Sequence, residues 1–246
     1  MVTTSVTSEV LAAEPHAYRP LLAARLRRAA VIVILLAIVL LTLLALRYAH
    51  QQAAGRLDRA LDIYLRTQLR QEQSLTRALI SLADPPHAAM LVAALAGAAA
   101  LARRWSGVML VLGGTLTAVV ISEGILKPLT GRLRYGHLTF PSGHTTAMAA
   151  IAIAILLTGA QWPRSVVLRL CASLAAIIVA VGVAIALVAQ HIHYVTDTIA
   201  GWCVAVAVVL ALALALDFFT PSIRSRYRAG SRRPGRPARP ISRSSR

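Results

Sequence analysis

The chain has 246 residues, of which 57% are hydrophobic, and its mean hydropathy is +0.67. This composition, with uncharged runs as long as a bilayer requires, excludes an ordinary water-soluble domain and indicates a multi-spanning membrane protein. The net charge of +17 comes from basic residues that flank apolar runs instead of forming one face with interleaved aromatic residues, so we expect no nucleic-acid partner.

The first expected elements are a polar cytoplasmic head over residues 1–28 and a transmembrane helix over residues 29–46. A signal peptide would have a shorter apolar core of about 7 to 15 residues, so a retained anchor is favoured. Residues 47–87 are polar and mixed in charge, and leucines recur every four residues from Leu57 to Leu69, which predicts a helix with one apolar stripe. This connector is either an interfacial helix near a site entrance or an ordinary connector packed on the bundle.

Five further apolar runs follow, which predicts an all-α bundle of six transmembrane helices. Residues 88–218 would form the helical core, and the arginine-rich residues 219–246 a disordered tail that can touch anionic lipid headgroups. The first of the five runs is short for the roughly 20 residues that a bilayer needs. The five predicted spans cover residues 88–102, 105–126, 145–160, 170–189 and 198–216.

Six spans would place both termini on the same side of the membrane. That side carries 17 lysine and arginine residues in the head, the alternate connections and the tail, whereas the other side carries 9. The positive-inside rule therefore predicts cytoplasmic termini and an extracytoplasmic connector. The polar patches described next would then lie at the extracytoplasmic face of a cell membrane.

The first polar patch follows the run that ends at residue 126 and contains Lys127, the only lysine among 26 basic residues. Lys127 and Arg134 are seven residues apart, close to two helical turns, so both cationic heads can point to one anion. Arg132 is a possible additional donor to the same anion. Glu123 lies four residues before Lys127, which predicts an ion pair between them.

The second patch, Pro141 to His144, precedes the next predicted span. Gly143 would let backbone amides approach an anion closely, at a helix start whose unpaired N–H groups favour negative charge. Ser142 would add a hydroxyl donor, and His144 would be placed as a general acid for a leaving oxygen. The alternative is that this tetrapeptide only caps a helix.

The third patch contains His193 and Asp197, four residues apart and therefore neighbours on a helix. An aspartate that accepts the proton of one ring nitrogen would orient the other nitrogen as a nucleophile. Metal binding by His191 and His193 with His144 and Asp197 is the competing interpretation, but no CxxC or HExxH spacing supports it. We therefore expect neither a metal ion nor another cofactor.

Taken together, the three patches resemble the signature of the type 2 phosphatidic acid phosphatase superfamily of membrane lipid phosphatases. That signature reads Lys, six residues, Arg-Pro; then Pro-Ser-Gly-His; then Ser-Arg, five residues, His, three residues, Asp. The resemblance covers residues 105–216 and implies six helices, a site at the outer membrane face and a metal-independent phosphohistidine mechanism. It implies phosphate binding by Lys127, Arg134, Ser142 and Gly143, acid catalysis by His144, nucleophilic attack by His193 and orientation of that nucleophile by Asp197.

The sequence departs from this signature at two places. Tyr135 stands where the signature has proline, and Ala186 and Leu187 stand where it has Ser-Arg, so one phosphate-binding arginine is missing. A donor in its place could come from Gln190, His191 or Arg132.

The sequence therefore predicts an integral membrane phosphatase that acts on a lipid phosphate or pyrophosphate outside the cytoplasm. Polyprenyl diphosphate is the first expected substrate and a phosphatidate-type glycerolipid the second. The alternative is a catalytically weakened relative that binds or moves phospholipid headgroups. In either case the expected partners are the membrane and a lipid phosphate.

Overall fold

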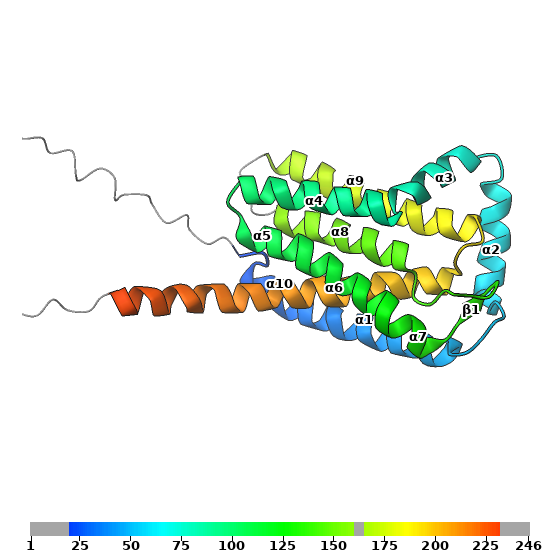
Figure 1. The fold of residues 1–246 in the computed structure, drawn as a ribbon, viewed down its shortest axis with the longest axis horizontal. Coiled ribbons are helices and arrows are strands. Elements are labelled where there is room, and N and C mark those ends of the chain that lie inside the picture. The colour runs from blue at the N-terminus through cyan, green and yellow to red at the C-terminus, as the bar shows by residue number, and fades with distance from the viewer. Residues whose placement is uncertain (1–19, 160–164, 232–246) are drawn as a thin grey trace, which may run out of the picture.

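The computed structural model describes residues 20–159 and 165–231, and almost all regular structure in these ranges is helical (Figure 1). Most helices run parallel to one long axis, and α2 crosses one end of the bundle (Figure 1). A short 3-10 turn, Ala24–Leu26, leads into the first helix. The helices are α1 (Arg27–Tyr48), α2 (Arg56–Gln68), α3 (Gln73–Leu82), α4 (Pro85–Leu101), α5 (Trp105–Met109), α6 (Thr115–Val120), α7 (Lys127–Thr130), α8 (Gly143–Gly159), α9 (Val166–Ala189) and α10 (Val195–Ser231).

The third predicted span is one continuous helical segment in the structure. Two π-helical stretches, Leu110–Gly114 and Ile121–Leu126, join α5, α6 and α7. Four helical segments in the described ranges are long and apolar enough to cross a bilayer, namely Ala24–Tyr48, Trp105–Thr130, Val166–Ala189 and Val195–Phe219.

Two other apolar segments bear on the predicted number of spans. Helices α3 and α4 together satisfy the same criteria as a pair bent by 57°, which would make a fifth span. Helix α8 is apolar but has only 17 residues. The chain is therefore a helical, multi-pass membrane protein, and the number of six spans stays a prediction.

Helix α8 forms the centre of the bundle and packs against α9 and α10 (Figure 1). Its sequence is rich in alanine, and most of its side chains are buried. Small side chains let helix backbones approach closely within a membrane, where packing rather than water exclusion drives association. Helix α1 packs on α10 at the outside and exposes most of its apolar side chains, as expected for a helix in contact with lipid.

The connector differs from the single helix predicted for it. It folds as two helices, α2 and α3, and the chain turns between them at residues 69–72. Most of the predicted leucine stripe is partly buried, at Leu61, Leu65 and Leu69, whereas Leu57 is half-exposed and Asp58 beside the stripe is fully buried. The second of these helices joins α4 in the bent pair, so the apolar segment that begins at residue 88 in the prediction is longer than expected.

The last helix also differs from its prediction. Helix α10 continues to Ser231, well past the expected end of the span at residue 216. The expected disordered tail over 219–246 therefore begins with helix, and residues 232–246 lie outside the described ranges. The described ends of the chain lie at one end of the bundle, and α2, α7 and β1 lie at the other (Figure 1).

A short antiparallel hairpin follows α7. Strands β1 (Leu133–Arg134) and β2 (His137–Leu138) pair directly. Gly131, which ends α7, has φ +58°, and a Cβ there would lie 2.6 Å from His50 Nδ1. Glycine is thus needed where the end of α1 approaches the loop that carries the first motif.

Candidate active site

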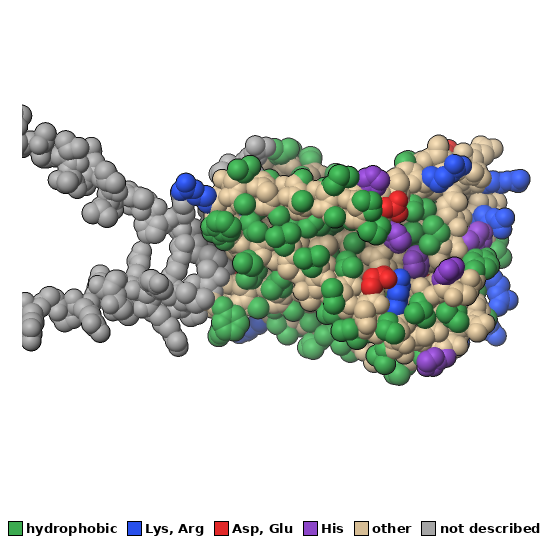
Figure 2. Space-filling view, in the orientation of Figure 1, with side chains coloured by type: hydrophobic (Ala, Val, Ile, Leu, Met, Phe, Trp, Pro, Cys, Tyr) green, Lys and Arg blue, Asp and Glu red, His purple; other side chains and the backbone are tan. Residues whose placement is uncertain are grey.

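A cavity of about 810 Å³ lies near the end of the bundle that carries the hairpin. Figure 2 shows histidine, acidic and basic side chains gathered toward this end, and hydrophobic side chains over the rest of the same face. The structure brings together residues from all three predicted motifs. Five predicted site residues line the cavity: Lys127, Arg134, Gly143, His144 and His193.

Lys127 begins α7 directly after a π-helical stretch. Its Nζ lies 2.7 Å from Glu123 Oε2, which confirms the ion pair predicted from their spacing. A Cβ on Gly143 would collide with the Glu123 carboxyl group, so a larger residue there would displace Glu123 from its place beside α8. The charge of Lys127 is partly neutralised by Glu123, and a bound phosphate would compete with that carboxylate.

Arg134 ends β1 and is almost fully buried beside the cavity. Its Nη1 donates to the carbonyl oxygen of His193 at 2.8 Å. Its Nη2 lies 3.1 Å from Asp62 Oδ2 and 2.9 Å from His191 Nδ1. The guanidinium group also stacks on the ring of Tyr194 at 4.3 Å. These contacts fix the first motif against the third.

Ser142 lies directly before α8 and makes the contacts of a helix cap. The backbone N–H of Thr145 donates to Ser142 Oγ at 3.4 Å, and the Ser142 N–H donates to the carbonyl oxygen of Asp197 at 3.0 Å. The Ser142 side chain is fully buried and lies outside the cavity lining. Capping is the alternative that the sequence left open, and donation from Ser142 to phosphate stays a prediction.

His144 lies in the first turn of α8 and lines the cavity. Its Nε2 is 3.6 Å from Asp84 Oδ1, at the start of α4. Its ring centroid is 6.4 Å from the ring centroid of His193. Two imidazoles from separate motifs therefore face one cavity, at a distance that a single phosphoryl group could bridge.

His193 and Asp197 are neighbours, as their spacing predicts, but they do not form a close hydrogen bond. His193 Nδ1 lies 3.7 Å from Asp197 Oδ2, and this nitrogen has no hydrogen-bond partner among the described residues. Asp197 Oδ2 accepts the backbone N–H of Tyr194 at 3.0 Å. Asp197 is fully buried and lies outside the cavity lining, so its predicted role of orienting His193 stays a prediction.

The structure does not place Arg132 in the cavity lining, so its predicted role as a phosphate donor gains no support from this geometry. Its side chain is fully buried, and the guanidinium group donates to Asp58 at 2.7 Å and to Asp197 at 2.6 Å. The group also lies between the rings of Tyr48, at 4.1 Å, and Tyr194, at 4.3 Å. Two carboxylates and two aromatic faces therefore hold Arg132 away from any substrate.

Tyr194 separates the two arginines of the first motif, because both guanidinium groups stack on its ring. Burial raises the pKa of the Tyr194 phenol above its ordinary value, and the charges of Arg134 and Arg132 oppose that shift. The phenol is therefore neutral at physiological pH. Its hydroxyl donates to the carbonyl oxygen of Gln52 at 3.3 Å, which ties the third motif to the connector.

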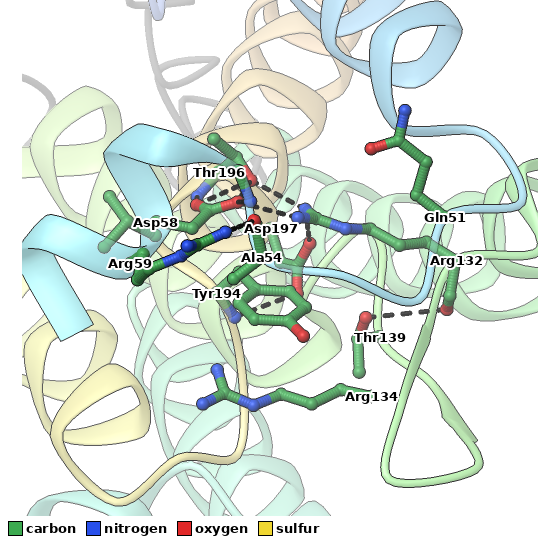
Figure 3. A network of polar contacts seen from close by, with 12 residues as sticks. Gln51, Ala54, Asp58, Arg59, Arg132, Arg134, Thr139, Tyr194, Thr196 and Asp197 are labelled. Carbon is green, nitrogen blue, oxygen red and sulfur yellow. Dashed lines mark hydrogen bonds and ion pairs between the residues drawn. The ribbon is translucent and has the colours of Figure 1, made fainter.

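Sequence reasoning missed the two connector aspartates of α2, Asp58 and Asp62. Asp58 pairs with Arg132, and Asp62 lies 3.1 Å from Arg134 and 3.0 Å from His191 Nδ1. Figure 3 shows Asp58 from α2 pointing at Arg132 and the start of α10. The signal was present, because two acids four residues apart share one helix face, but a solvated face explains such spacing equally well.

The structure also separates the three suggested substitutes for the missing arginine. Leu187, at the arginine position, is fully buried in the hydrophobic core. The amide of Gln190 donates to Thr76 Oγ1 at 2.8 Å and so faces α3 instead of the cavity. With Arg132 also held away, only His191 of the three lines the cavity.

The residues of the metal interpretation do not converge. Within residues 20–159 and 165–231, no group of three or more histidine, cysteine, aspartate or glutamate side chains is placed to hold a metal ion. The carboxylates that His144, His191 and His193 approach are three different ones: Asp84, Asp62 and Asp197 respectively.

Comparison with known proteins gave two matches. Residues 127–220 match the family model of the PAP2 superfamily. The fold is similar to that of a solved structure described as the first transmembrane PAP2 type phosphatidylglycerolphosphate phosphatase from Bacillus subtilis. The TM-score is 0.62 and the sequence identity is 19%, and the match covers 78% of this chain and 96% of that one. No curated protein matches the chain. The family-model match over residues 127–220, which contains the three ordered motifs, supports a place for this chain in the type 2 phosphatidic acid phosphatase (PAP2) superfamily, and the solved structure shares its fold.

Proposed function

We propose that this protein is a membrane phosphatase that hydrolyses a lipid phosphate or pyrophosphate through a phosphohistidine intermediate. One observation carries the proposal: a single cavity holds Lys127, Arg134 and two facing imidazoles at its polar end and continues along apolar helix surfaces. A cation pair recognises a phosphate group, and two imidazoles can supply a nucleophile and an acid. The match to the family model of a phosphatase superfamily supports the same conclusion.

The apolar part of the cavity supports a lipid rather than a soluble phosphate ester. It is lined by small side chains of α4 and by larger aliphatic side chains between residues 112 and 119. Such a surface can hold a hydrocarbon chain that enters from the bilayer. Polyprenyl diphosphate is the first proposed substrate and a phosphatidate-type glycerolipid the second, and the name of the Bacillus subtilis protein of similar fold adds phosphatidylglycerolphosphate to the glycerolipids to be tested.

In the proposed reaction, His193 Nε2 attacks phosphorus and forms an N–P bond as the bond from phosphorus to the leaving oxygen breaks. His144 gives its proton to that oxygen, which leaves with the lipid. Water then attacks the phosphohistidine, His144 takes a proton from the water, and the N–P bond breaks to release inorganic phosphate. Lys127 and Arg134 would hold the phosphoryl oxygens throughout.

We also propose that the site lies at the extracytoplasmic face and that the termini are cytoplasmic. The charge count along the chain supports this orientation. The separation of the described chain ends from the cavity end of the bundle is consistent with it.

The second candidate, a weakened relative that binds or moves phospholipid headgroups, is favoured by one observation: Leu187 is buried where the superfamily signature has a phosphate-binding arginine. Purified protein in detergent micelles should release inorganic phosphate from at least one member of a panel of polyprenyl diphosphates, phosphatidate and phosphatidylglycerolphosphate. Binding to vesicles that contain these lipids, without phosphate release from any of them, would favour the second candidate.

A further inference from the structure

The carboxylate of Asp58 is fully buried, although its helix, α2, belongs to the polar connector. Oδ2 accepts an N–H of Arg132 at 2.7 Å, and Oδ1 accepts the backbone N–H of Thr196 at 3.0 Å and its hydroxyl at 2.9 Å. A charge without access to water is tolerated only with such complete pairing. One connector side chain thus contacts the first motif and the chain beside the third.

Two contacts link Asp58 to the proposed nucleophile. Arg132 Nη1 donates to Asp197 Oδ1 at 2.6 Å, and Asp197 Oδ2 lies 3.7 Å from His193 Nδ1. The guanidinium group also stacks on the rings of Tyr48 and Tyr194, which helps to hold it beside both carboxylates. Asp58 does not line the cavity, so any effect on the chemistry is indirect, and Arg132 is the charged side chain that Asp58 shares with Asp197.

The formal charges of this cluster show what Asp58 contributes. Asp58 and Asp197 are two anions around one cation, Arg132, so the three side chains carry a net charge of −1. Without Asp58, the contact between Arg132 and Asp197 would be a neutral pair. The imidazole of His193 gains positive charge when it bonds to phosphorus, and a net negative charge nearby stabilises that change, whereas a neutral pair does so far less.

We propose that Asp58 is a positioning residue of the active site, which neutralises Arg132 so that Asp197 keeps its negative charge for His193. This inference rests on the proposed function, because it takes His193 as the nucleophile. It assigns the connector helix α2 a part in the site beyond packing on the bundle. Because Asp58 acts on the reacting group and not on substrate binding, its loss should lower kcat and leave KM nearly unchanged.

The test compares purified full-length wild type with Asp58→Asn and with the double variant Asp58→Asn/Arg132→Gln. The double variant removes both charges, so Asp197 regains its unopposed charge. Asp217→Asn is the matched control, because Asp217 is buried and holds the backbone N–H groups of Leu21 and Leu22 near the opposite end of the bundle.

Two quantities are measured for each variant, one of which needs no lipid substrate. The first is kcat and KM for phosphate release. The second is the rate at which diethylpyrocarbonate transfers an ethoxycarbonyl group to His193 at pH 8, where an ordinary imidazole is neutral. The ring nitrogen forms a bond to the carbonyl carbon, ethyl carbonate leaves and decomposes to carbon dioxide and ethanol, and mass spectrometry follows the His193 peptide relative to the exposed His87.

We expect Asp58→Asn to lower kcat at least tenfold and the reactivity of His193 at least threefold, with KM within threefold of wild type. The double variant should have a kcat for phosphate release within fivefold of wild type. Its rate of His193 modification by diethylpyrocarbonate should be within twofold of wild type. Asp217→Asn should stay within twofold on both. If Asp58 had only a structural role, the losses caused by Asp58→Asn and Arg132→Gln would instead add in the double variant.

His193 that reacts at the wild-type rate in Asp58→Asn would overturn the proposal, whatever the lipid assay shows. A double variant as slow as Asp58→Asn would overturn it too, since contacts and not charge would then matter. If Asp58→Asn does not fold, the double variant decides, and a loss of His193 reactivity beyond twofold refutes the charge argument. If wild type hydrolyses no lipid phosphate but Asp58→Asn slows His193 and the double variant restores it, the proposed function fails and the positioning role stands.

Discussion

Replacing His191 by alanine should cost this enzyme much of its activity, because His191 is the one of three suggested substitutes for the missing arginine that lines the cavity. Its Nδ1 is 2.9 Å from Arg134 Nη2 and 3.0 Å from Asp62 Oδ2. His191→Ala would remove a polar group beside the phosphate site and release Arg134 from one of its contacts. A hydrogen bond to a charged group contributes about 1.5 to 3 kcal/mol, which corresponds to a loss of roughly 10- to 150-fold in kcat/KM.

The neighbouring residue supplies the matched control. Gln190→Ala should leave kcat/KM within about threefold of wild type, because the Gln190 amide faces Thr76. Its cost should appear in stability instead, at about 0.5 to 1.5 kcal/mol for one lost hydrogen bond. The assay is phosphate release from the preferred lipid, together with thermal unfolding of the same detergent-solubilised samples. A tenfold loss in Gln190→Ala with near-normal His191→Ala would refute this assignment.

Leu187→Arg completes the test of the missing arginine. Leu187 is fully buried in the core, and overpacking alone costs about 1 to 3 kcal/mol, before the cost of burying a charge is added. We therefore expect a lower unfolding temperature and no gain in activity. A stable Leu187→Arg protein that gains turnover over an inactive wild type, with or without Ala186→Ser, would instead favour the weakened relative.

Four further outcomes are expected. His193→Ala should abolish turnover, orthovanadate should inhibit wild type and EDTA should not; activity lost to EDTA and restored by a divalent ion would revive the metal interpretation. A cysteine introduced after Thr139 should be labelled from outside the cell, and one introduced after residue 227 should be labelled only from the cytoplasm. Labelling of the first position only from the cytoplasm would reverse the proposed topology. Glu123→Gln should lower KM several-fold, because phosphate no longer competes with a carboxylate for Lys127. The free energy of unfolding should change by less than about 1 kcal/mol, since the Glu123–Lys127 pair is partly exposed. A raised KM would contradict this prediction. Asp58→Ala should destabilise the fold by about 3 to 5 kcal/mol by leaving a buried arginine charge underpaired, and a normal unfolding curve would show that the cluster adjusts without it.

The helical membrane class was predictable from the sequence because it depends on local pattern, whereas the meeting of the three motifs was predicted from the phosphate chemistry that their residues share. Apolar run length reports on membrane spans, and the spacing of Glu123 and Lys127 sufficed for their ion pair, which has an N–O distance of 2.7 Å. Polar patches between apolar runs lie at the ends of the predicted spans. Their residue types, cations and histidines, then indicate that they bind one phosphate group. The contact between His144 and His193 was accessible in this way.

The sequence did not indicate that Arg134 lines the cavity and that Arg132 does not. The two residues are two positions apart, carry the same charge and stack on the same tyrosine ring. Which of them reaches the cavity is decided by the partner that each one meets, and Asp58 and Asp62 are more than 70 residues away in the chain. No local rule connects residues so far apart, so a donor role for both arginines was the natural expectation.

The same long-range contacts explain why two aspartates share the inward face of α2 with leucines of the predicted stripe. The inward face carries Leu61 and Leu65 of the predicted stripe together with Asp58 and Asp62, and Leu57 is half-exposed. Hydrophobic burial alone would favour the leucine stripe. The buried arginines behind the cavity need carboxylates, however, and an unpaired buried charge costs more than one leucine gains by burial. The charges of the site therefore account for the two inward aspartates of α2, and a helix outside the three motifs holds the residue that we propose keeps the charge of Asp197 available to His193.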